Sequence, residues 1–368
     1  MNSNIEKILR KIENNGFEAY VVGGFVRDNL LGIYTTDVDI CTNALPKDII
    51  KIFKVKKETE NYGSISLNDG TYNYDITTYR KESSYENRRP QSIEYTNNLI
   101  LDIQRRDFTI NSLCMSSSGQ IFDYLNGKED IKNKTIRVIG DIDTKLTEDP
   151  LRIMRAIRFA AVLDFKLDSK IILFIKNNKN LIESLSFTRK REELDKIFSS
   201  RNALNGLNLL KKLDLLDTLK INYDTIVVVP DILGVWAQID FDEHYPFTKN
   251  SLDSISKIRI LIQQKTISDY DLYNYGLYIC SVVADILDYP KEDLNIRFKE
   301  LPIYSKKDLK ITSKDIIESL NIEPSNKFKD IFNDLVLNVL NKSLVNEREV
   351  LIKYIQDKWK WYRWVIKF

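Results

Sequence analysis

Two aspartates separated by one valine, Asp37-Val38-Asp39, are the residues best suited to chemistry in this sequence. On a strand, residues two apart face the same side, so the two carboxylates would project together while Val38 points into the core. Neighbouring carboxylates repel each other unless a cation lies between them. Oxygen ligands alone select a hard ion such as Mg²⁺, which also accepts phosphate oxygens. A solvated acidic turn is the alternative interpretation of this pair.

A glycine pair, Gly23-Gly24, precedes the aspartates. Its backbone can approach a phosphate closely, and a helix that begins beside Gly24 offers unpaired N–H groups to an anion. Arg27, one turn into that helix, is placed to contact a triphosphate. Together with the aspartates, these residues favour a nucleotide site over the acidic turn.

Asp75 is a third candidate carboxylate, within the strand-like segment Tyr74-Asp75-Ile76-Thr77-Thr78. It would be a metal ligand or a general base for a hydroxyl nucleophile, or else an ordinary exposed strand residue. Further along, Arg105-Arg106-Asp107 is typical of either a structural salt-bridge node or a nucleotide contact.

One broad face of a predicted helix carries three arginines spaced three residues apart, Arg152, Arg155 and Arg158. Cations aligned in this way repel one another unless they meet an anion. The alternative is a solvated basic stripe whose partners are Glu148 and Asp149 at the start of the helix.

Asp149 and Arg152 also suggest a way to read a base. A carboxylate only accepts hydrogen bonds and a guanidinium only donates them. Cytosine and adenine both present an amino donor beside a ring-nitrogen acceptor, whereas uracil and guanine present the reverse. An Asp/Arg pair would therefore accept C and A and leave unpaired groups against U and G, at about 1–3 kcal/mol for each buried group.

The elements that must position these residues follow from periodicity. Ile5, Ile8, Leu9 and Ile12 predict a first helix that ends near Gly16, and a second helix should end near Leu31-Gly32. Strands are predicted at Ala19–Val22, at Asp37–Ile40 and at Tyr72–Tyr79. This mixture predicts an α+β head.

Beyond residue 138 the sequence is predominantly helical. Thr147 is predicted to cap a helix whose first turn holds Glu148 and Asp149, with Pro150 tolerated there. Prolines at Pro290 and Pro302 predict joints between helical parts. The expected division is a head at 1–138, a neck at 139–205, a body at 206–300 and a tail at 301–368.

Composition narrows the chemistry. The chain has 368 residues, 55 Lys+Arg against 53 Asp+Glu, and one histidine, His244. A site that needs paired imidazoles, such as a histidine zinc site, is therefore excluded within one chain. Three widely separated cysteines, Cys41, Cys114 and Cys280, argue against a disulfide framework. No run of residues has the length of a membrane span, so a cytoplasmic protein without a membrane partner is expected.

In order and spacing, these residues resemble the class II tRNA nucleotidyltransferases, which comprise CCA-adding enzymes and bacterial poly(A) polymerases. The similarity extends over roughly the first 200 residues. Its blocks are Gly23-Gly-Phe-Val-Arg-Asp28, Asp37-Val-Asp39, Asp75-Ile-Thr-Thr-Tyr-Arg80, Arg88-Arg-Pro90, Arg105-Arg-Asp-Phe-Thr-Ile-Asn111, Glu148-Asp-Pro-Leu-Arg152 through Phe159, and Arg189-Lys-Arg-Glu-Glu-Leu-Asp-Lys-Ile197.

The resemblance implies a polymerase-β-type nucleotidyltransferase head, a small mixed sheet with helices, followed by an all-helical neck, body and tail. It implies template-independent addition of C, C and A to the tRNA 3′ end from CTP and ATP, with pyrophosphate released. The tRNA acceptor arm would be the macromolecular partner, with no obligate protein partner. Asp37 and Asp39 would hold two Mg²⁺ ions, with Asp75 as a further catalytic carboxylate. The nucleotide would be contacted by Gly24, Arg27, Arg106, Asp149, Arg152, Arg155 and Arg158.

The sequence also departs from the family pattern. Asp75 stands where relatives usually have glutamate, and Ser313 and Ser325 stand where they often have glycine. The segment 80–90 corresponds to a flexible loop of nearly full length, which favours complete CCA addition. A CC-adding or A-adding enzyme, a poly(A) polymerase and a non-catalytic RNA-binding protein are the alternatives. The aromatic and basic residues at 358–364 are expected to anchor the tail or, alternatively, to stack on RNA bases.

Overall fold

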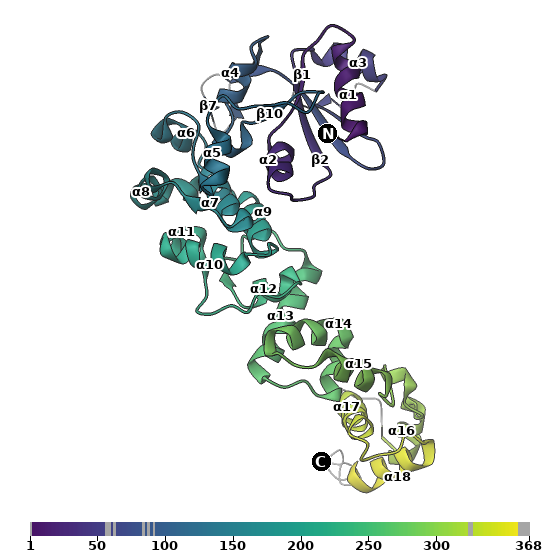
Figure 1. Ribbon diagram of the computed structural model, residues 1–368. Helices are drawn as coiled ribbons and strands as arrows, with labels where there is room; N and C mark the ends of the chain where they lie inside the picture. Colours follow the sequence, from purple (N-terminus) through teal and green to yellow (C-terminus); the bar gives the residue numbers. More distant parts are fainter. Residues whose placement is uncertain are drawn as a thin grey trace. The chain divides into compact units, whose positions relative to one another are not determined.

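The computed structural model describes residues 2–55, 60–61, 64–82, 85–86, 89–90, 93–322 and 327–359 (Figure 1). Arg88, Ser325, residues 360–364 and part of the expected loop at 80–90 lie outside the described residues. Contacts divide the chain into two compact units, Met1–Asn222 with Phe241–Pro246, and Tyr223–Asp240 with Phe247–Phe368. The four-part division at 138, 205 and 300 remains a prediction.

A mixed seven-stranded sheet forms the centre of the head, with the order β11-β10-β1-β2-β5-β4-β3. Its strands are β1 (Ala19–Val22), β2 (Asp37–Thr42), β3 (Glu60–Asn61), β4 (Ser64–Asn68), β5 (Asn73–Thr78), β10 (Cys114–Met115) and β11 (Ile121–Phe122). The three predicted strands are thus confirmed. β2 runs parallel to β5 and antiparallel to β1. Exposure alternates along the start of β2, where Val38 is buried between exposed Asp37 and Asp39, as the strand pattern predicts.

Helices pack on this sheet because their apolar residues recur at helical spacing. The helices of the head are α1 (Ser3–Glu13), α2 (Gly24–Leu30), α3 (Pro46–Phe53), α4 (Leu99–Gln104) and α5 (Gly127–Lys132), with the short 3₁₀ turn η2 (Thr109–Asn111). In α1, Ile5, Leu9 and Ile12 are fully buried, and α1 packs on β1 and α3. Two antiparallel strand pairs complete the head, β6 (Arg80–Glu82) with β9 (Ile93–Tyr95), and β7 (Tyr85–Glu86) with β8 (Arg89–Pro90).

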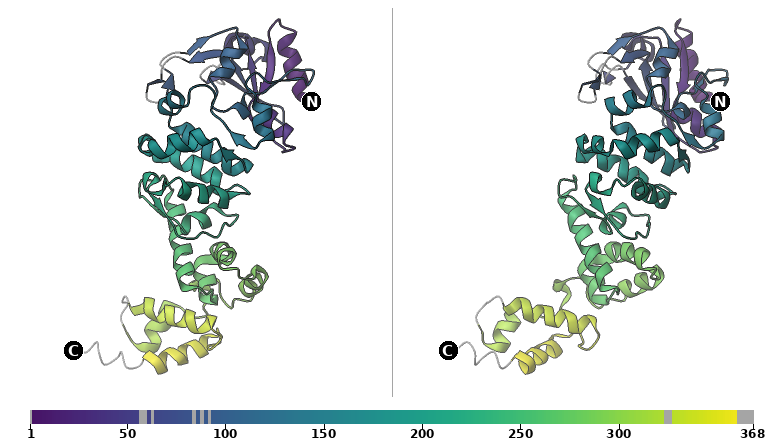
Figure 2. Two further views of the ribbon diagram at one scale, coloured as in Figure 1. Left: turned by 60° about the vertical axis from the view of Figure 1, so that its left-hand side comes forward. Right: turned by 90° about the vertical axis from the view of Figure 1, so that its left-hand side faces the viewer.

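The rest of the first unit is predominantly helical (Figure 2). It contains α6 (Ile142–Glu148), α7 (Leu151–Leu163), α8 (Ser169–Asn177), η3 (Lys179–Ser184), α9 (Phe187–Phe198), α10 (Ala203–Lys212) and α11 (Leu216–Leu219). Two short strands, β12 (Thr135–Ile136) and β13 (Lys166–Leu167), pair in parallel. Helix α7 packs on α9 and α10, where a Cβ at Gly206 would lie 2.3 Å from Ile197 and 2.8 Å from Ala161, so only glycine fits.

The predicted start of a helix at Thr147 is wrong. Asp141 caps α6 instead, because its carboxylate accepts the backbone N–H of Thr144 at 2.8 Å. Thr147 therefore lies in the last turn of α6. Asp149 adopts an extended backbone after that helix, and Pro150 is the N-cap of α7, so the acidic residues precede the arginine helix rather than forming its first turn.

The second unit is helical. Its elements are α12 (Ile232–Ala237), α13 (Lys249–Gln264), α14 (Asp269–Leu287), α15 (Lys291–Lys299), η4 (Lys306–Asp308), α16 (Ser313–Leu320), α17 (Lys327–Leu340) and α18 (Arg348–Trp359). Short strands β14 (Ile221–Asn222) and β15 (Asp240–Phe241) lie near the unit boundaries in the sequence. Pro290 precedes α15 and Pro302 follows it, so both prolines lie between helices, and their role as joints between helical parts remains a prediction. Asp315 of α16 binds Arg348 of α18.

The described residues bear on two expectations from the sequence, that the cysteines form no disulfide framework and that no segment spans a membrane. The three cysteines are buried and free. Among the described helices, none has both the length and the apolar character needed to cross a bilayer. The expected α+β fold, a small mixed sheet with helices followed by helical segments, is confirmed.

Candidate active site

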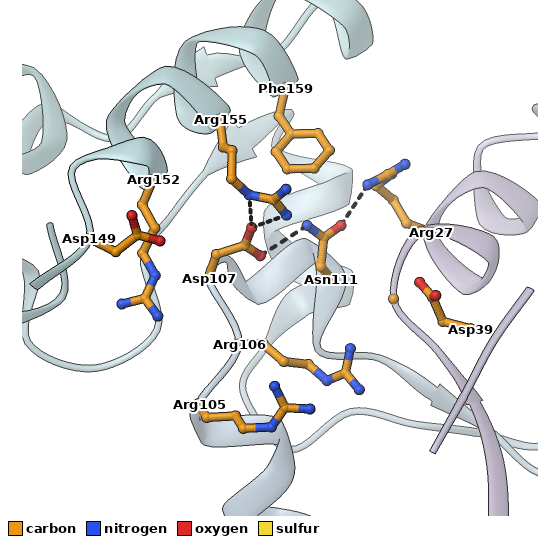
Figure 3. Close-up of a pocket in the computed structure, with 12 residues that line it drawn as sticks. Arg27, Asp39, Arg105, Arg106, Asp107, Asn111, Asp149, Arg152, Arg155 and Phe159 are labelled. Atoms are coloured by element: carbon orange, nitrogen blue, oxygen red, sulfur yellow. Dashed lines mark hydrogen bonds and ion pairs between the residues drawn. The ribbon is translucent and has the colours of Figure 1, made fainter. Parts of the chain in front are cut away.

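A cavity of about 410 Å³ in the first unit brings together most of the predicted site residues (Figure 3). It is lined by Gly23, Gly24, Arg27, Asp39, Arg105, Arg106, Asp107, Asn111, Asp149, Arg152, Arg155 and Phe159. These residues come from β1–α2, β2, the segment between α4 and η2, and α7 with the junction before it. Seven of the ten predicted site residues line the cavity. Asp37, Asp75 and Arg158 are not among the lining residues.

The three predicted carboxylates lie on the neighbouring interior strands β2 and β5. The parallel register places Asp39 directly beside Asp75, and Asp37 beside Asn73. Asp37 accepts a hydrogen bond from the Asn73 amide at 3.1 Å, and Asp75 accepts one from the Ser66 hydroxyl at 2.5 Å. Two adjacent strands therefore present three acids within one small area of the head.

Asp39 experiences the electrostatic cost of this arrangement. Asp39 is exposed to the cavity, but the surrounding protein still reduces the hydration of its carboxylate and raises the pKa of Asp39, and the charge of Arg106 opposes this change. The negative charges of Asp75 and Asp37 raise the pKa of Asp39 further. A bound cation would relieve both the repulsion and the loss of hydration.

The described residues contain no preassembled group of three or more metal-ligating side chains. Mg²⁺ is commonly held by one or two carboxylates, with substrate phosphates and waters as the remaining ligands. The β2–β5 carboxylates therefore suit a Mg²⁺ site that the nucleotide completes.

Gly23 keeps the space beside Asp39 open. It has a φ of 78°, and a Cβ at this position would lie only 3.3 Å from Asp39 Oδ2. A side chain at residue 23 would thus be strained and would crowd the carboxylate. Gly24 begins α2 and has more room, since its nearest neighbour would be an Arg27 nitrogen at 3.5 Å.

Arg27 belongs to a continuous hydrogen-bonded network that crosses the cavity (Figure 3). Its guanidinium donates to Asn111 Oδ1 at 2.5 Å, and the Asn111 amide donates to Asp107 Oδ1 at 3.2 Å. Asp107 Oδ2 in turn accepts two hydrogen bonds from Arg155, at 2.8 and 2.5 Å. Helix α2, turn η2 and helix α7 are therefore linked through side chains, which fixes two cations at separate points of the cavity.

Asp107 remains ionised within this network. Burial by itself would raise the pKa of Asp107, but the charge and hydrogen bonds of Arg155 outweigh burial, and Asn111 adds a further hydrogen bond. The pKa of Asp107 is consequently held below its usual value. The resulting Asp107–Arg155 pair orients the guanidinium at the inner turn of α7.

Asp149 and Arg152 lie next to each other at the start of α7 (Figure 3). Asp149 Oδ1 accepts a hydrogen bond from the backbone N–H of Leu151 at 3.1 Å, and among the described residues no hydrogen bond engages its Oδ2. Arg152 is 5% exposed and donates to the Lys145 carbonyl at 3.0 Å. Both side chains are thus held by the α6–α7 junction, so their donor and acceptor groups have a fixed position in the cavity wall.

Phe159 packs among the arginines. Its ring lies 5.2 Å from the Arg27 guanidinium, 5.5 Å from that of Arg155 and 4.3 Å from that of Arg158. Arg158 points to Glu193 of α9, 3.1 Å away, and burial lowers the pKa of Arg158. Its placement indicates a packing and ion-pair position behind Phe159 rather than on the cavity surface.

The cavity contains five residues that were not among the predicted site residues, namely Gly23, Arg105, Asp107, Asn111 and Phe159. All five belong to motifs that the sequence analysis singled out. The spacing of Asp107 and Asn111 indicates that they can meet across one turn. Nothing in the local pattern indicates that Asn111 reaches Arg27, since these residues are far apart in sequence.

Comparison with known proteins supports this description. Residues 19–137 match the family described as Poly A polymerase head domain, and residues 244–355 match a tRNA nucleotidyltransferase domain 2 family. A CCA-adding enzyme of Ligilactobacillus salivarius is 32% identical over 94% of both chains, and one of Lactobacillus helveticus is 34% identical over 95% of this chain and 96% of its own.

Solved structures agree in fold. A Bacillus stearothermophilus CCA-adding enzyme in complex with CTP superposes with a TM-score of 0.85 at 26% identity, covering 97% of this chain and 98% of its own. A Thermotoga maritima CCA-adding enzyme shares the fold with a TM-score of 0.67 at 21% identity, covering 97% of this chain and 96% of its own. By sequence along nearly its whole length, and by fold, this chain belongs to the class II tRNA nucleotidyltransferases, the family of the CCA-adding enzymes.

Proposed function

We propose that this protein adds C, C and A to the 3′ end of tRNA, using CTP and ATP and releasing pyrophosphate. One observation carries the proposal: a single cavity joins a carboxylate beside a glycine pair to half-buried Asp149 and buried Arg152, a pair suited to C and A. The first feature suits phosphoryl transfer, and the second suits a choice of base without a template. The relatives' names, and the CTP in the Bacillus stearothermophilus structure, are in keeping with it.

Base selection would depend on Asp149 and Arg152. Asp149 Oδ2 would accept a hydrogen bond from the amino group of C or A, and the Arg152 guanidinium would donate one to the ring nitrogen. U or G would set a carbonyl against the carboxylate and an N–H against the guanidinium. Because both protein groups are held by the α6–α7 junction, they cannot easily turn away from the mismatch.

The nucleotide's phosphates would lie toward Gly23, Gly24 and Arg27. A side chain at residue 23 would fill the space beside Asp39, so the glycine lets phosphate oxygens approach the carboxylates. Arg27 and Arg106 supply positive charge on this side, and Arg155 supplies it from α7. Ion pairs with Asp28, Asp102 and Asp107, respectively, hold these three cations in place before the nucleotide binds, which favours positioning as the main source of rate enhancement.

Asp37 and Asp39 would hold two Mg²⁺ ions, and the raised pKa of Asp39 beside Asp75 fits a site completed by cations. When bound, the metal ions stabilise negative charge on the attacking and leaving oxygens. Asp75, beside Asp39 in the strand register, either accepts the proton of the tRNA 3′-hydroxyl or provides a further ligand. The 3′ oxygen forms a bond to the α-phosphorus while the bond to the β-phosphate oxygen breaks.

The helical remainder of the chain would hold the tRNA acceptor arm through its shape and its phosphates. The cytoplasm is the compartment that we infer, in keeping with three free buried cysteines.

Purified protein, Mg²⁺ and both CTP and ATP, one of them radiolabelled, test the function directly on tRNAs that end before the first C, after C and after CC. Extension of all three to the same final length supports CCA addition. Extension of only the first two indicates a CC-adding enzyme, and extension of only the third an A-adding enzyme. Long A tails would indicate a poly(A) polymerase, and no extension of any tRNA would indicate a non-catalytic RNA-binding protein.

A further inference from the structure

A second cavity of about 310 Å³ lies beside the active-site cavity in the head. It is lined by Val22, Asp39, Ile40, Ser64, Thr77, Arg80, Arg105 and Arg106. Asp39, Arg105 and Arg106 line both cavities, whereas Gly23, Gly24 and the base-reading pair line only the first. Asp39 therefore belongs to the wall that the two cavities share.

Three guanidinium groups give the second cavity an affinity for anions. Asp102 lies behind them, fully buried, and accepts from Arg105 at 2.8 Å, from Arg106 at 3.1 Å and from the Arg80 backbone at 3.2 Å. One carboxylate can neutralise only one of the two guanidiniums that it holds. Asp102 thus anchors the cationic wall and balances part of its charge, and Asp39, which also lines the cavity, opposes the charge of Arg106.

Hydrogen-bonding groups in this cavity point to a ligand. The Nε of Arg106 is buried and has no acceptor among the residues that the structure describes. Buried polar groups are nearly always satisfied, so such a donor calls for an acceptor from outside the chain. The hydroxyls of Thr77 and Ser64 also line the cavity. Thr77 donates to Ser64 Oγ at 3.2 Å, so the Ser64 hydroxyl can act as a further donor to a ligand.

The position of the cavity indicates which anion it binds. In-line displacement places the attacking oxygen and the leaving pyrophosphate on opposite sides of the α-phosphorus. The proposed triphosphate site, beside Gly23 and Gly24, lies in the first cavity. Thr77 lies two residues after Asp75 on β5, on the same face as this carboxylate, so the second cavity adjoins the candidate base for the hydroxyl.

We propose that the second cavity binds the last phosphodiester of the tRNA acceptor strand, with Arg80 as its principal clamp, and so presents the terminal 3′-hydroxyl to the carboxylates. The inference rests on the proposed function. It assigns the growing RNA end to the head itself, at Arg80, Thr77 and Ser64, in addition to any grip by the helical parts. A guanidinium can hold two phosphate oxygens at once, which fixes their direction as well as their distance.

The contact between Arg80 and the last phosphodiester is tested by removing the charge of each partner in turn. Two tRNAs lacking CCA are prepared, one unmodified and one with a neutral methylphosphonate at the last phosphodiester. We expect the modification to raise KM for tRNA about tenfold in the natural protein, as loss of a charged hydrogen bond should. Arg80→Ala should raise KM for unmodified tRNA by a similar factor, and the modification should then add little. KM for CTP should stay unchanged.

Arg10→Ala, which removes an exposed arginine of α1, is the matched control and should behave as the natural protein. Arg80→Lys keeps the charge and should lie between the two; it replaces Arg80→Ala if that variant fails to fold. No penalty from the methylphosphonate, or an equal penalty with and without Arg80, would overturn the inference. The inference would also be overturned if Arg80→Ala raised KM for pyrophosphate in the reverse reaction and left KM for tRNA unchanged, because Arg80 would then bind the leaving pyrophosphate. CCA addition to the unmodified tRNA checks the proposed function separately.

Discussion

The two walls of the active-site cavity are built in opposite ways. On one side Asp39 of β2 lines the cavity, and Asp37 of β2 and Asp75 of β5 lie beside it outside the lining. These three residues, here called the carboxylate wall, gather like charges that repel one another. The arginine wall, Arg152 and Arg155 on α7, holds each guanidinium with a protein acceptor, the Lys145 carbonyl or Asp107. The carboxylate wall has negative charges that need a cation, whereas the guanidiniums of the arginine wall already have hydrogen-bond acceptors within the protein.

The difference assigns a separate task to each wall. Like-charged acids in one place cost stability unless a cation joins them, so the carboxylate wall suits binding of metal and phosphate. A guanidinium with fixed partners keeps one direction, so the arginine wall suits recognition of a base whose donors and acceptors have one pattern. Removing a residue from the first should affect rate, and removing one from the second should affect selection.

Asp39→Ala should have the largest effect. Without this carboxylate the proposed metal ions would be bound poorly, and several kcal/mol of transition-state stabilisation would be lost. The rate of nucleotide addition should therefore fall about a thousandfold or more. Thermal stability without Mg²⁺ should stay the same or rise, because repulsion from Asp75 and Asp37 disappears. Single-turnover addition and thermal unfolding measure the two effects.

Asp253→Ala is a suitable control, since it removes an exposed acid of α13 in the second unit. Its addition rate should match that of the natural protein. An Asp39→Ala variant that adds nucleotides at the natural rate, or that unfolds at a much lower temperature, would contradict the description of the carboxylate wall.

Arg152→Ala should blur base choice. Discrimination by one buried polar group amounts to about 1–3 kcal/mol, so the preference for CTP over UTP and for ATP over GTP should fall about 5- to 150-fold. The ratios of kcat/KM for these nucleotides measure the change. Arg152→Lys retains the charge but not the planar donors, and should recover only part of the preference. Unchanged ratios in both variants would remove Arg152 from base reading.

Asp107→Asn should weaken the arginine wall by about 2 kcal/mol in unfolding free energy, because charged hydrogen bonds to Arg155 are lost. The pKa of Asp107 is lowered in the folded protein, so its contribution is present above the unfolded value near 4 and is lost as pH falls through the folded pKa. The stability difference between the natural protein and Asp107→Asn should therefore shrink on acidification below about pH 4. Chemical unfolding at several pH values measures it, and a difference independent of pH would contradict the ion-pair explanation.

Gly23→Ala should have the smallest energetic effect, about 1–2 kcal/mol of stability, because alanine is strained at a φ of 78°. Its Cβ would also crowd Asp39, so addition should slow. Gly24→Ala is the neighbouring control and should be milder, since its Cβ would meet only an ordinary contact at 3.5 Å. Equal effects from the two substitutions would show that Gly23 has no special role.

Local pattern was sufficient for the carboxylate wall. Alternation along β2 predicts that Asp37 and Asp39 face together, and the structure confirms it, because the period of a strand is fixed by the backbone. The register of β2 against β5, which brings Asp75 beside Asp39, depends on pairing between separate segments. The sequence contains no local signal for that register.

The arginine wall was predictable only in part. Helical spacing places Arg152, Arg155 and Arg158 on one broad face, but Arg158 turns to Glu193 of a later helix. The predicted cap at Thr147 is wrong because Asp141 and Pro150 divide the segment into two helices. Partners far apart in sequence decide both outcomes, and local propensity does not encode them.

A competition among all four ribonucleotides on a tRNA that lacks CCA, carried out in parallel with Asp39→Ala and Arg152→Ala, tests the division between the two walls most directly. We predict that Asp39→Ala incorporates almost nothing of any nucleotide, whereas Arg152→Ala still incorporates nucleotides but admits U and G. A slow Asp39→Ala enzyme with altered base choice, or an Arg152→Ala enzyme with natural base choice, would contradict the account.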